Sequence, residues 1–274
     1  MLTLTIALAA GMILSTPASA ADDGWNPLFN GKDLTGWYTF LQEHGRDSDP
    51  DGIITIEDGA IHLYKNVEDG SRVVMGYIGT EKEYGDYHLR LQYRFGAKKF
   101  EPRYNLKKDA GLYYHITGPD AVWPRSLQYQ IEETNVGDII ALFGMKLDTW
   151  VDPKTREAVM PDYPTFLDPE RGGVPRVLGD KGIEYQGHAA EAVEKDGWND
   201  VELIVRGTEI THILNGQVVN HGVNVRFDDP ENPGAVRPIT RGRIALEIEA
   251  AELWFRNVEI RMLGDADAPS TDTD

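Results

Sequence analysis

The sequence predicts an all-β protein built from two packed antiparallel sheets. Short runs in which apolar and polar residues alternate recur along the chain, and this period of two is typical of half-buried strands. Turn residues such as Asn215-Gly216 separate the runs, and Asn-Gly favours a tight hairpin. The sequence shows no convincing long amphipathic helix and no repeat. Many short strands with tight turns favour two sheets packed face to face.

The expected strands follow one another along most of the chain. The pattern is clearest in 87–95 and 126–133, and each strand should place one side chain in two in the core. The twelve expected strands are 52–57, 60–65, 72–79, 87–95, 111–117, 126–133, 139–144, 200–206, 209–214, 217–220, 242–249 and 252–262. The core should include Tyr87, Leu89, Leu91, Leu127, Tyr129 and Ile131.

One long insertion interrupts this rhythm. Residues 148–198 are rich in Pro, Gly and charge and show few strand patterns. Loops of this length are uncommon in compact domains and often form lids or binding walls. We therefore expect the insertion to border a site.

Both ends of the chain differ from its middle. Residues 1–20 are apolar and end in Ala18-Ser19-Ala20, which is typical of a cleaved export signal, so the mature protein would be periplasmic or secreted. A membrane anchor is the alternative, but the apolar run is shorter than the roughly 20 residues that span a bilayer. We expect one domain at 21–263, no membrane span after cleavage, and a disordered acidic tail at 264–274.

Composition excludes several classes of function. The formal net charge of -18 argues against a nucleic-acid partner, because phosphates are bound by clustered Lys and Arg. The chain has no Cys, so a thiolate nucleophile is excluded. It has no nucleotide-binding Gly motif and no strong metal motif; 47–52 reads as a calcium-type loop or, better, as a flexible acidic turn. No cofactor is certain, and a divalent cation stays an option. The oligomeric state is unknown.

The chemistry-bearing residues gather in 109–140, which reads as two strands joined by a Gly-Pro turn. In the second strand Gln128, Gln130 and Glu132 share the face opposite the apolar positions. Trp123 and Arg125 come just before it. An open face with amides, a carboxylate, a cation and an aromatic ring can bind a polyhydroxylated ligand and move protons.

Each candidate also has a structural alternative. His115 is a base or a core histidine, and Trp123 is a stacking platform or a core residue. Arg125 holds an anionic oxygen or pairs with Glu132, and Gln130 binds hydroxyls or joins an amide ladder. Glu132 and Glu133 belong to a site or to a solvated strand edge, and Arg243 with Glu247 on strand 242–249 belong to a cleft floor or to a solvated sheet. His188 in the insertion is a second acid/base, a metal ligand or neither.

Several ordered signatures resemble those of the 3-keto-disaccharide hydrolase domain family. They are W-N-P-L-F-N-G-K-D-L-T-G-W at 25–37, E-Y-G-D-Y-H-L-R-L-Q-Y-R at 83–94, A-G-L-Y-Y-H at 110–115, V-W-P-R-S-L-Q-Y-Q-I at 122–131, D-G-W-N-D-V-E-L-I-V-R-G at 196–207, T-H-I-L-N-G at 211–216 and G-R-I-A-L-E-I-E-A-A-E-L-W-F-R-N-V-E-I at 242–260. The resemblance covers residues 25–263, and the combination is far more specific than any single signature.

The resemblance implies a concanavalin-like (laminarinase-like) jelly roll, export, and action on sugars oxidised at C3. This chain departs from the family at three places. It has Asp109-Ala110 where the family usually has Asn-Ser, Gln128 where the family has Glu, and Glu247 where the family has Gln. These departures imply that the acidic groups of the cleft are redistributed.

A 3-keto sugar suggests its own chemistry. The ketone acidifies the C2 hydrogen, so a base can remove that proton and the C1 substituent can leave by β-elimination; added water then gives net hydrolysis. The candidates for catalysis are His115, Glu132 and Glu133. The candidates for substrate binding are Trp123, Arg125, Gln128, Gln130, His188, Arg243 and Glu247. Direct hydrolysis stays open, and so does a different class of protein, a non-catalytic carbohydrate-binding jelly roll.

Overall fold

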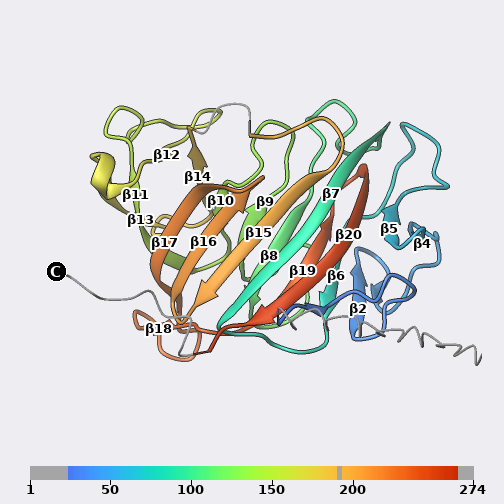
Figure 1. The fold of residues 1–274 in the computed structure, drawn as a ribbon, viewed down its shortest axis with the longest axis horizontal. Coiled ribbons are helices and arrows are strands. Elements are labelled where there is room, and N and C mark those ends of the chain that lie inside the picture. The colour runs from blue at the N-terminus through green and yellow to red at the C-terminus, as the bar shows by residue number, and fades with distance from the viewer. Residues whose placement is uncertain (1–23, 190–192, 265–274) are drawn as a thin grey trace, which may run out of the picture.

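Two antiparallel sheets packed face to face form the body of the protein (Figure 1). The computed structural model describes residues 24–189 and 193–264. The strands within these residues are β1 (Asn26–Pro27), β2 (Trp37–Leu41), β3 (Gly45–Arg46), β4 (Ile54–Glu57), β5 (Ala60–Leu63), β6 (Gly76–Thr80), β7 (Tyr87–Lys99), β8 (Gly111–Ile116), β9 (Leu127–Gln130), β10 (Ile139–Ala141), β11 (Met145–Val151), β12 (Thr165–Phe166), β13 (Val174–Leu178), β14 (Glu184–His188), β15 (Asn199–Arg206), β16 (Glu209–Leu214), β17 (Gln217–Asp228), β18 (Val236–Pro238), β19 (Arg243–Ile248) and β20 (Ala251–Met262). One 3-10 helix, η1 (Pro169–Arg171), accompanies them. The prediction of an all-β, two-sheet jelly-roll sandwich is confirmed.

The strand order places segments that are distant in sequence side by side. The first sheet runs β4-β5-β20-β7-β15-β16-β17-β11-β13, with the long β7 and β20 at its centre. The second sheet runs β3-β2-β6-β19-β8-β9-β10-β14. Among the paired strands of the described residues only β12 and β14 run parallel, and the isolated bridge between Arg72 and Glu101 is parallel as well. The second sheet therefore joins β19, β8 and β9 as neighbours.

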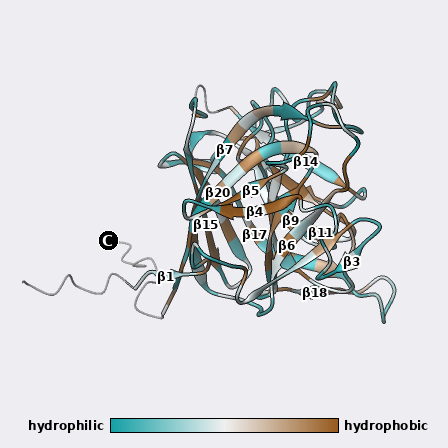
Figure 2. Ribbon diagram, turned by 90° about the vertical axis from the view of Figure 1, so that its right-hand side faces the viewer, coloured by the Kyte–Doolittle hydropathy of each residue, from teal (hydrophilic) through white to brown (hydrophobic). Residues whose placement is uncertain are grey.

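The core lies between the two sheets, and the alternation of the sequence explains it. In β7, Tyr87, Leu89 and Leu91 are buried, whereas His88 and Arg90 are partly exposed on the other face. Figure 2 shows this mixture of hydrophobic and hydrophilic positions along the strands. The six residues predicted to be in the core are all buried: Tyr87, Leu89, Leu91, Leu127, Tyr129 and Ile131. That prediction is confirmed.

The insertion contains more regular structure than its sequence indicated. Residues 148–198 include the end of β11, all of β12, β13 and β14, and the helix η1, which Asp168 caps by accepting a hydrogen bond from the Glu170 N–H at 2.8 Å. The strands were missed because β13 lies at a sheet edge with two of its five residues exposed, and β14 lacks apolar alternation. Their backbone pairing with β11 and β10 holds them.

The expected signal peptide at 1–20 lies outside the described residues. So does the expected acidic tail, apart from Gly264. Within residues 24–189 and 193–264, no helix has the length and apolar character needed to cross a membrane.

Candidate functional site

A cavity of about 530 Å³ opens on the face of the second sheet that points away from the core. Its polar side comes from β9 and from the ends of the neighbouring strands, and its apolar and aromatic side comes from the β8–β9 loop, residues 140–143 and the insertion. The lining residues are Arg103, Lys107, Asp109, Trp123, Gln128, Gln130, Glu132, Asn135, Ile140, Leu142, Phe143, Met160, Pro161, Tyr163, Ile183, Tyr185 and Glu249. The insertion thus borders the site, as its length suggested.

Arg103 organises the polar side of the cavity. Its Nη1 lies 3.0 Å from Glu249 Oε1, and its Nη2 forms an ion pair with Asp109 and lies 3.9 Å from Glu132 Oε1. Asp109 and Glu249 face each other in an isolated antiparallel bridge just beyond the ends of β8 and β19, which brings the two carboxyl groups to one guanidinium. One cation therefore faces three acidic side chains.

The amides of β9 continue this network. Gln130 Nε2 donates to Asp109 Oδ1 at 2.9 Å, and Gln128 Nε2 donates to Gln130 Oε1 at 2.6 Å and to Glu247 Oε2 at 2.7 Å. Tyr113 donates its hydroxyl proton to Glu247. Glu249 lies two residues beyond Glu247, and its carboxyl group acts electrostatically on that of Glu247 beneath the cavity.

A glycine makes this close packing feasible. A Cβ atom at Gly111 would lie 2.4 Å from Gln128 Nε2 and 2.5 Å from Glu247 Oε2, which is well inside van der Waals contact. Gly111 is therefore the position on β8 across which the side chains of β9 and β19 can meet.

The site retains protons because it has more buried carboxyl groups than cations. Burial, together with the Glu249 carboxyl, raises the pKa of Asp109 and of Glu247 well above the usual range, and burial also raises the pKa of Glu249. Burial alone would lower the pKa of Arg103, but Glu249 and Asp109 outweigh it and raise that pKa. These three carboxyl groups therefore keep their protons to a higher pH than exposed carboxyl groups do.

Four of the predicted residues meet at the cavity, and a fifth lies just below it. Trp123, Gln128, Gln130 and Glu132 line it, and Glu247 supports Gln128 from underneath. Trp123 is 42% exposed, as a stacking platform at a rim would be. The two glutamines, expected on an open face, are only 3% and 7% exposed. The neighbouring network and the residues contributed by the insertion cover them.

His115, the first candidate for the base, does not lie at the cavity. The pairing of β8 with β19 shifts register between Arg243 and Ala245, and His115 has a positive φ of 55°. This bulge interrupts the alternation of side chains along β8, which would otherwise have placed His115 on the same face as Tyr113. Its side chain is buried, its backbone packs against Gly242, and burial lowers its pKa to about 4. The expectation that His115 shares a cleft with Glu132 is wrong.

Glu133 and Arg125 also point elsewhere. Glu133 Oε1 lies 3.2 Å from Lys108 Nζ and borders a different cavity, because the chain turns after β9 and reverses the direction of successive side chains. Arg125 Nε donates to the Phe143 carbonyl at 3.2 Å and does not pair with Glu132. Phe143 lines the cavity, so Arg125 supports its rim and not its floor.

Arg243 belongs to a separate polar cluster on the same sheet face. Its Nη1 lies 3.0 Å from Asp120 Oδ1, and Asp120 also accepts hydrogen bonds from Tyr77 at 2.6 Å and Tyr38 at 2.9 Å. These contacts fix the loop between β8 and β9 onto β2, β6 and β19. That loop carries Trp123.

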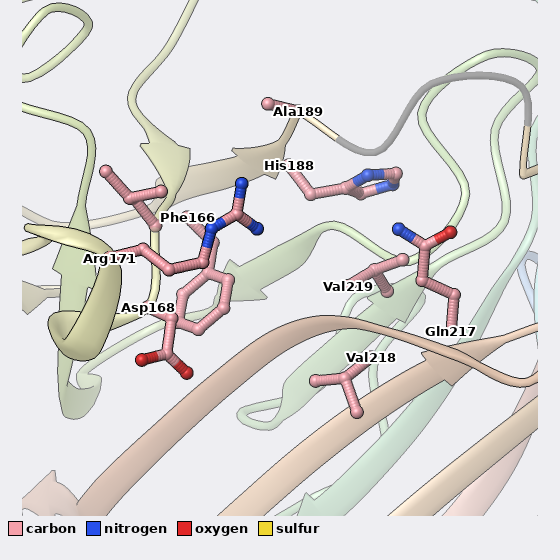
Figure 3. A pocket seen from close by; sticks show the side chains of 9 residues that line it. Phe166, Asp168, Arg171, His188, Ala189, Gln217, Val218 and Val219 are labelled. Carbon is pink, nitrogen blue, oxygen red and sulfur yellow. The ribbon is translucent and has the colours of Figure 1, made fainter.

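His188 lies on β14, behind the wall of the main cavity. Its Nε2 donates to the Val136 carbonyl at 2.7 Å, and burial lowers its pKa. It borders a smaller cavity of about 330 Å³, where Figure 3 shows His188 with Gln217 and Val219 on one side and Arg171 with Asp168 on the other. It also borders another cavity, next to Tyr163, which adjoins the main cavity.

The most important residues at the cavity were not among the candidates. Arg103 lies between the expected strands 87–95 and 111–117, and nothing in its sequence neighbourhood marks it. The sequence did mark Asp109 and Glu249, since Asp109 departs from the pattern of the resembled family and Glu249 alternates with Glu247. Tyr163 and Tyr185 were visible only as aromatic residues of a long insertion. In the described part of the chain, no group of three or more His, Asp or Glu side chains is placed to hold a metal ion.

The fold and this cavity define a jelly-roll protein with a polar cleft of the kind that holds a sugar. The family model described as a 3-keto-alpha-glucoside-1,2-lyase-like domain matches residues 24–261. The chain therefore belongs to this family, as its signatures predicted, and membership supports a carbohydrate-active function.

Solved structures resemble the chain in fold. A "putative glycosyl hydrolase" from Parabacteroides distasonis is 21% identical with a TM-score of 0.51, covering 88% of this chain and 94% of that one. A second structure from the same organism is 20% identical with a TM-score of 0.49, covering 87% and 99%. A Bacillus licheniformis β-glucanase is 10% identical with a TM-score of 0.44, covering 88% and 97%. Comparison with curated proteins gives no significant match.

Proposed function

We propose that the protein cleaves 3-keto-glycosides, including 3-keto-disaccharides, by removing the C2 proton and eliminating the C1 substituent, with hydration completing a net hydrolysis. One observation carries this proposal. A cavity with an aromatic rim holds a guanidinium, three carboxyl groups and two amides at its floor, in a chain that belongs to the 3-keto-alpha-glucoside-1,2-lyase-like family. These groups supply a base, an oxyanion partner and hydroxyl-binding amides.

Glu132 is the base in this proposal. Asp109 and Glu249 are tied to Arg103, and Glu247 lies beneath the floor. Glu132 lies at the cavity, its Oε2 held by Asn135 Nδ2 at 2.5 Å and its Oε1 at 3.9 Å from Arg103. The Asn135 contact orients the carboxylate and leaves its other oxygen facing the lined space.

Arg103 stabilises the enolate that proton removal creates. A guanidinium has five N–H donors, and two are used in the contacts with Asp109 and Glu249. The remaining donors near the cavity can bind the C3 oxygen as it becomes negative. Gln128 and Gln130 then bind sugar hydroxyls, and Trp123 stacks on a ring at the rim.

The test compares a 3-keto-disaccharide with its unoxidised parent. The wild-type protein should release sugar from the first and not from the second. Glu132→Gln should lower the rate by about 10²–10⁴, which is the usual contribution of a positioned base. Glu133→Gln is the matched control, because its side chain borders another cavity; it should keep the wild-type rate.

Two outcomes would overturn the proposal. If the wild-type protein binds the 3-keto-disaccharide without cleaving it, the protein is a carbohydrate-binding module. If Glu132→Gln and Glu133→Gln have equal rates, the base is another group.

We also propose that the protein acts outside the cytoplasm, after removal of residues 1–20. The apolar segment and the Ala18-Ser19-Ala20 pattern support this. The intact mass of the exported protein should correspond to a chain that starts at Ala21. A protein that keeps Met1 and fractionates with membranes would contradict it.

A further inference from the structure

A second cavity adjoins the first across Tyr163. It has a volume of about 790 Å³, and Lys107, Asn135, Pro161 and Tyr163 line both cavities. Tyr163 therefore stands at the boundary between two spaces, one with the base and the enolate partner proposed above and one without an assigned role.

A buried carboxyl group lies directly behind Tyr163. The Tyr163 hydroxyl oxygen is 2.6 Å from Asp138 Oδ2, and Asp138 is only 3% exposed. A Cβ atom at Gly187 would lie 3.0 Å from Tyr163 Cε2, so the glycine gives the ring room beside β14. The tyrosine is thereby fixed against the carboxyl group.

Within the described residues, no Lys or Arg lies within ion-pair distance of Asp138; Lys107 lowers its pKa from farther away, and Glu132 raises it. The one basic side chain within ion-pair distance is His188, whose Nε2 lies 3.8 Å from Asp138 Oδ1. Burial lowers the pKa of His188, which disfavours its charged form, and its Nε2 N–H is donated to the Val136 carbonyl. Burial raises the pKa of Asp138 to about 8, which leaves the carboxyl group protonated at neutral pH.

We propose that Asp138 and Tyr163 form a proton relay to the oxygen of the leaving group, which occupies the second cavity. This inference rests on the proposed function. When the Asp138 carboxyl group carries a proton, it donates to the Tyr163 oxygen, and the tyrosine O–H turns toward the space between the cavities. The tyrosine then touches the substrate, and Asp138 acts through it.

The atoms balance in this step. Glu132 takes the C2 proton, and the electron pair of that bond forms the enolate. When the C3 carbonyl re-forms, the C1–C2 double bond forms and the bond from C1 to the leaving oxygen breaks. That oxygen takes the Tyr163 proton, and Tyr163 takes the Asp138 proton. Water that adds later at C1 gives one proton to Asp138 through Tyr163, and Glu132, whose acid proton has by then exchanged with water, gives a proton to C2.

Leaving groups of different acidity test the relay. A 4-nitrophenyl 3-keto-glucoside loses a stable phenolate and needs no proton, whereas a methyl 3-keto-glucoside needs one. Tyr163→Phe and Asp138→Asn should each lose about 10²–10⁴ in kcat/KM with the methyl substrate and less than about tenfold with the nitrophenyl substrate. Tyr185→Phe is the matched control, because this tyrosine lines the first cavity and its ring lies 5.6 Å from that of Tyr163. It should affect both substrates equally.

The other outcomes overturn the relay. Equal losses on the two substrates would mean that Tyr163 and Asp138 only support the fold or bind substrate. Unchanged rates with the methyl substrate would mean that another acid protonates the leaving group. Near-ultraviolet circular dichroism of each variant shows whether the aromatic side chains around the two cavities keep their packing. A wild-type protein that cleaves neither substrate would overturn the proposed function itself, and the relay with it.

Discussion

Arg103 is held against more acidic groups than it can neutralise. Asp109, Glu249 and Glu132 surround it, and Glu247 lies behind Glu249. Buried carboxylates cannot all ionise beside one cation in a low-dielectric site, so the pKa values of Asp109, Glu247 and Glu249 are raised and these three groups are coupled. These carboxyl groups can therefore donate protons at the cavity, although no histidine of the described residues lines it.

Asp138 makes the stability of the protein depend on pH. Its ordinary pKa is 3.8 and burial raises it to about 8 in the folded protein. A raised folded pKa means that its stabilising contribution is complete below about 3.8 and is lost as pH rises toward 8. Asp138→Asn removes this loss. The unfolding free energy of the variant, relative to that of the wild type, should therefore rise by about 1.4 kcal/mol per pH unit between pH 5.5 and 7.5.

Urea unfolding at the two pH values measures this difference. The Asn side chain keeps an acceptor for Tyr163, so the contact itself is preserved. A stability difference that stays constant from pH 5.5 to 7.5 would show that Asp138 is already ionised in the folded protein.

Gln128 and Glu247 form one contact, and both depart from the family pattern. The family resemblance places Glu and Gln at these positions in the opposite order, and Gln128 Nε2 donates to Glu247 Oε2 at 2.7 Å. Gln128→Glu alone would set two carboxyl groups together at a buried position and should cost about 2–3 kcal/mol in unfolding free energy. Adding Glu247→Gln should recover most of the loss.

A double-mutant cycle of unfolding free energies tests this exchange. The two substitutions should show a favourable coupling of about 1–3 kcal/mol, because the residues touch. Strictly additive effects would mean that the contact carries no energy and that the two departures are independent.

At the scale of elements, the loop between β8 and β9 positions Trp123 at the rim. Asp120 anchors this loop by accepting from Tyr38 and Tyr77 and by pairing with Arg243. The anchor lies on β2, β6 and β19, outside the set of residues that line the cavity. The loop is thus fixed by contacts outside the cavity, while its Trp123 lies at the rim, where we propose that it stacks on the sugar.

Asp120→Ala should therefore weaken substrate binding without touching the chemistry. We expect KM to rise about tenfold, equivalent to about 1.4 kcal/mol, while kcat changes little. Trp123→Ala should have a similar effect, and the double variant should be no worse than either alone. Val236→Ala, at an exposed residue on β18, is the control. A fall in kcat with unchanged KM would contradict this role of the loop.

Elements with regular alternation were the ones that the sequence predicted well. β7 and β9 follow a strict period of two, so their buried faces could be read directly. The bulge at His115 has no such signal, because it depends on the register between β8 and β19. The edge strands β13 and β14 are held by backbone pairing, which leaves little trace in side-chain pattern.

At the scale of the whole molecule, the sheet order assembles the site. Residues 103–109, 128–132 and 247–249 are far apart in sequence, and they meet because β8 lies between β9 and β19. The insertion then covers this face and brings Tyr163 and Tyr185 to it. Sequence reasoning could place Trp123, Gln128, Gln130 and Glu132 there, since two neighbouring segments carry them. Arg103 required the three-dimensional contacts.

The central claim is that cleavage begins with removal of the C2 proton, and reaction in D₂O tests it most directly. Elimination followed by hydration breaks the C2–H bond, so the 3-keto sugar released at early times should carry deuterium at C2 when observed by NMR. Substrate held in D₂O without protein, and substrate with Glu132→Gln, correct for slow exchange beside the ketone. Released sugar that retains protium at C2 after complete cleavage would contradict the mechanism and favour direct hydrolysis.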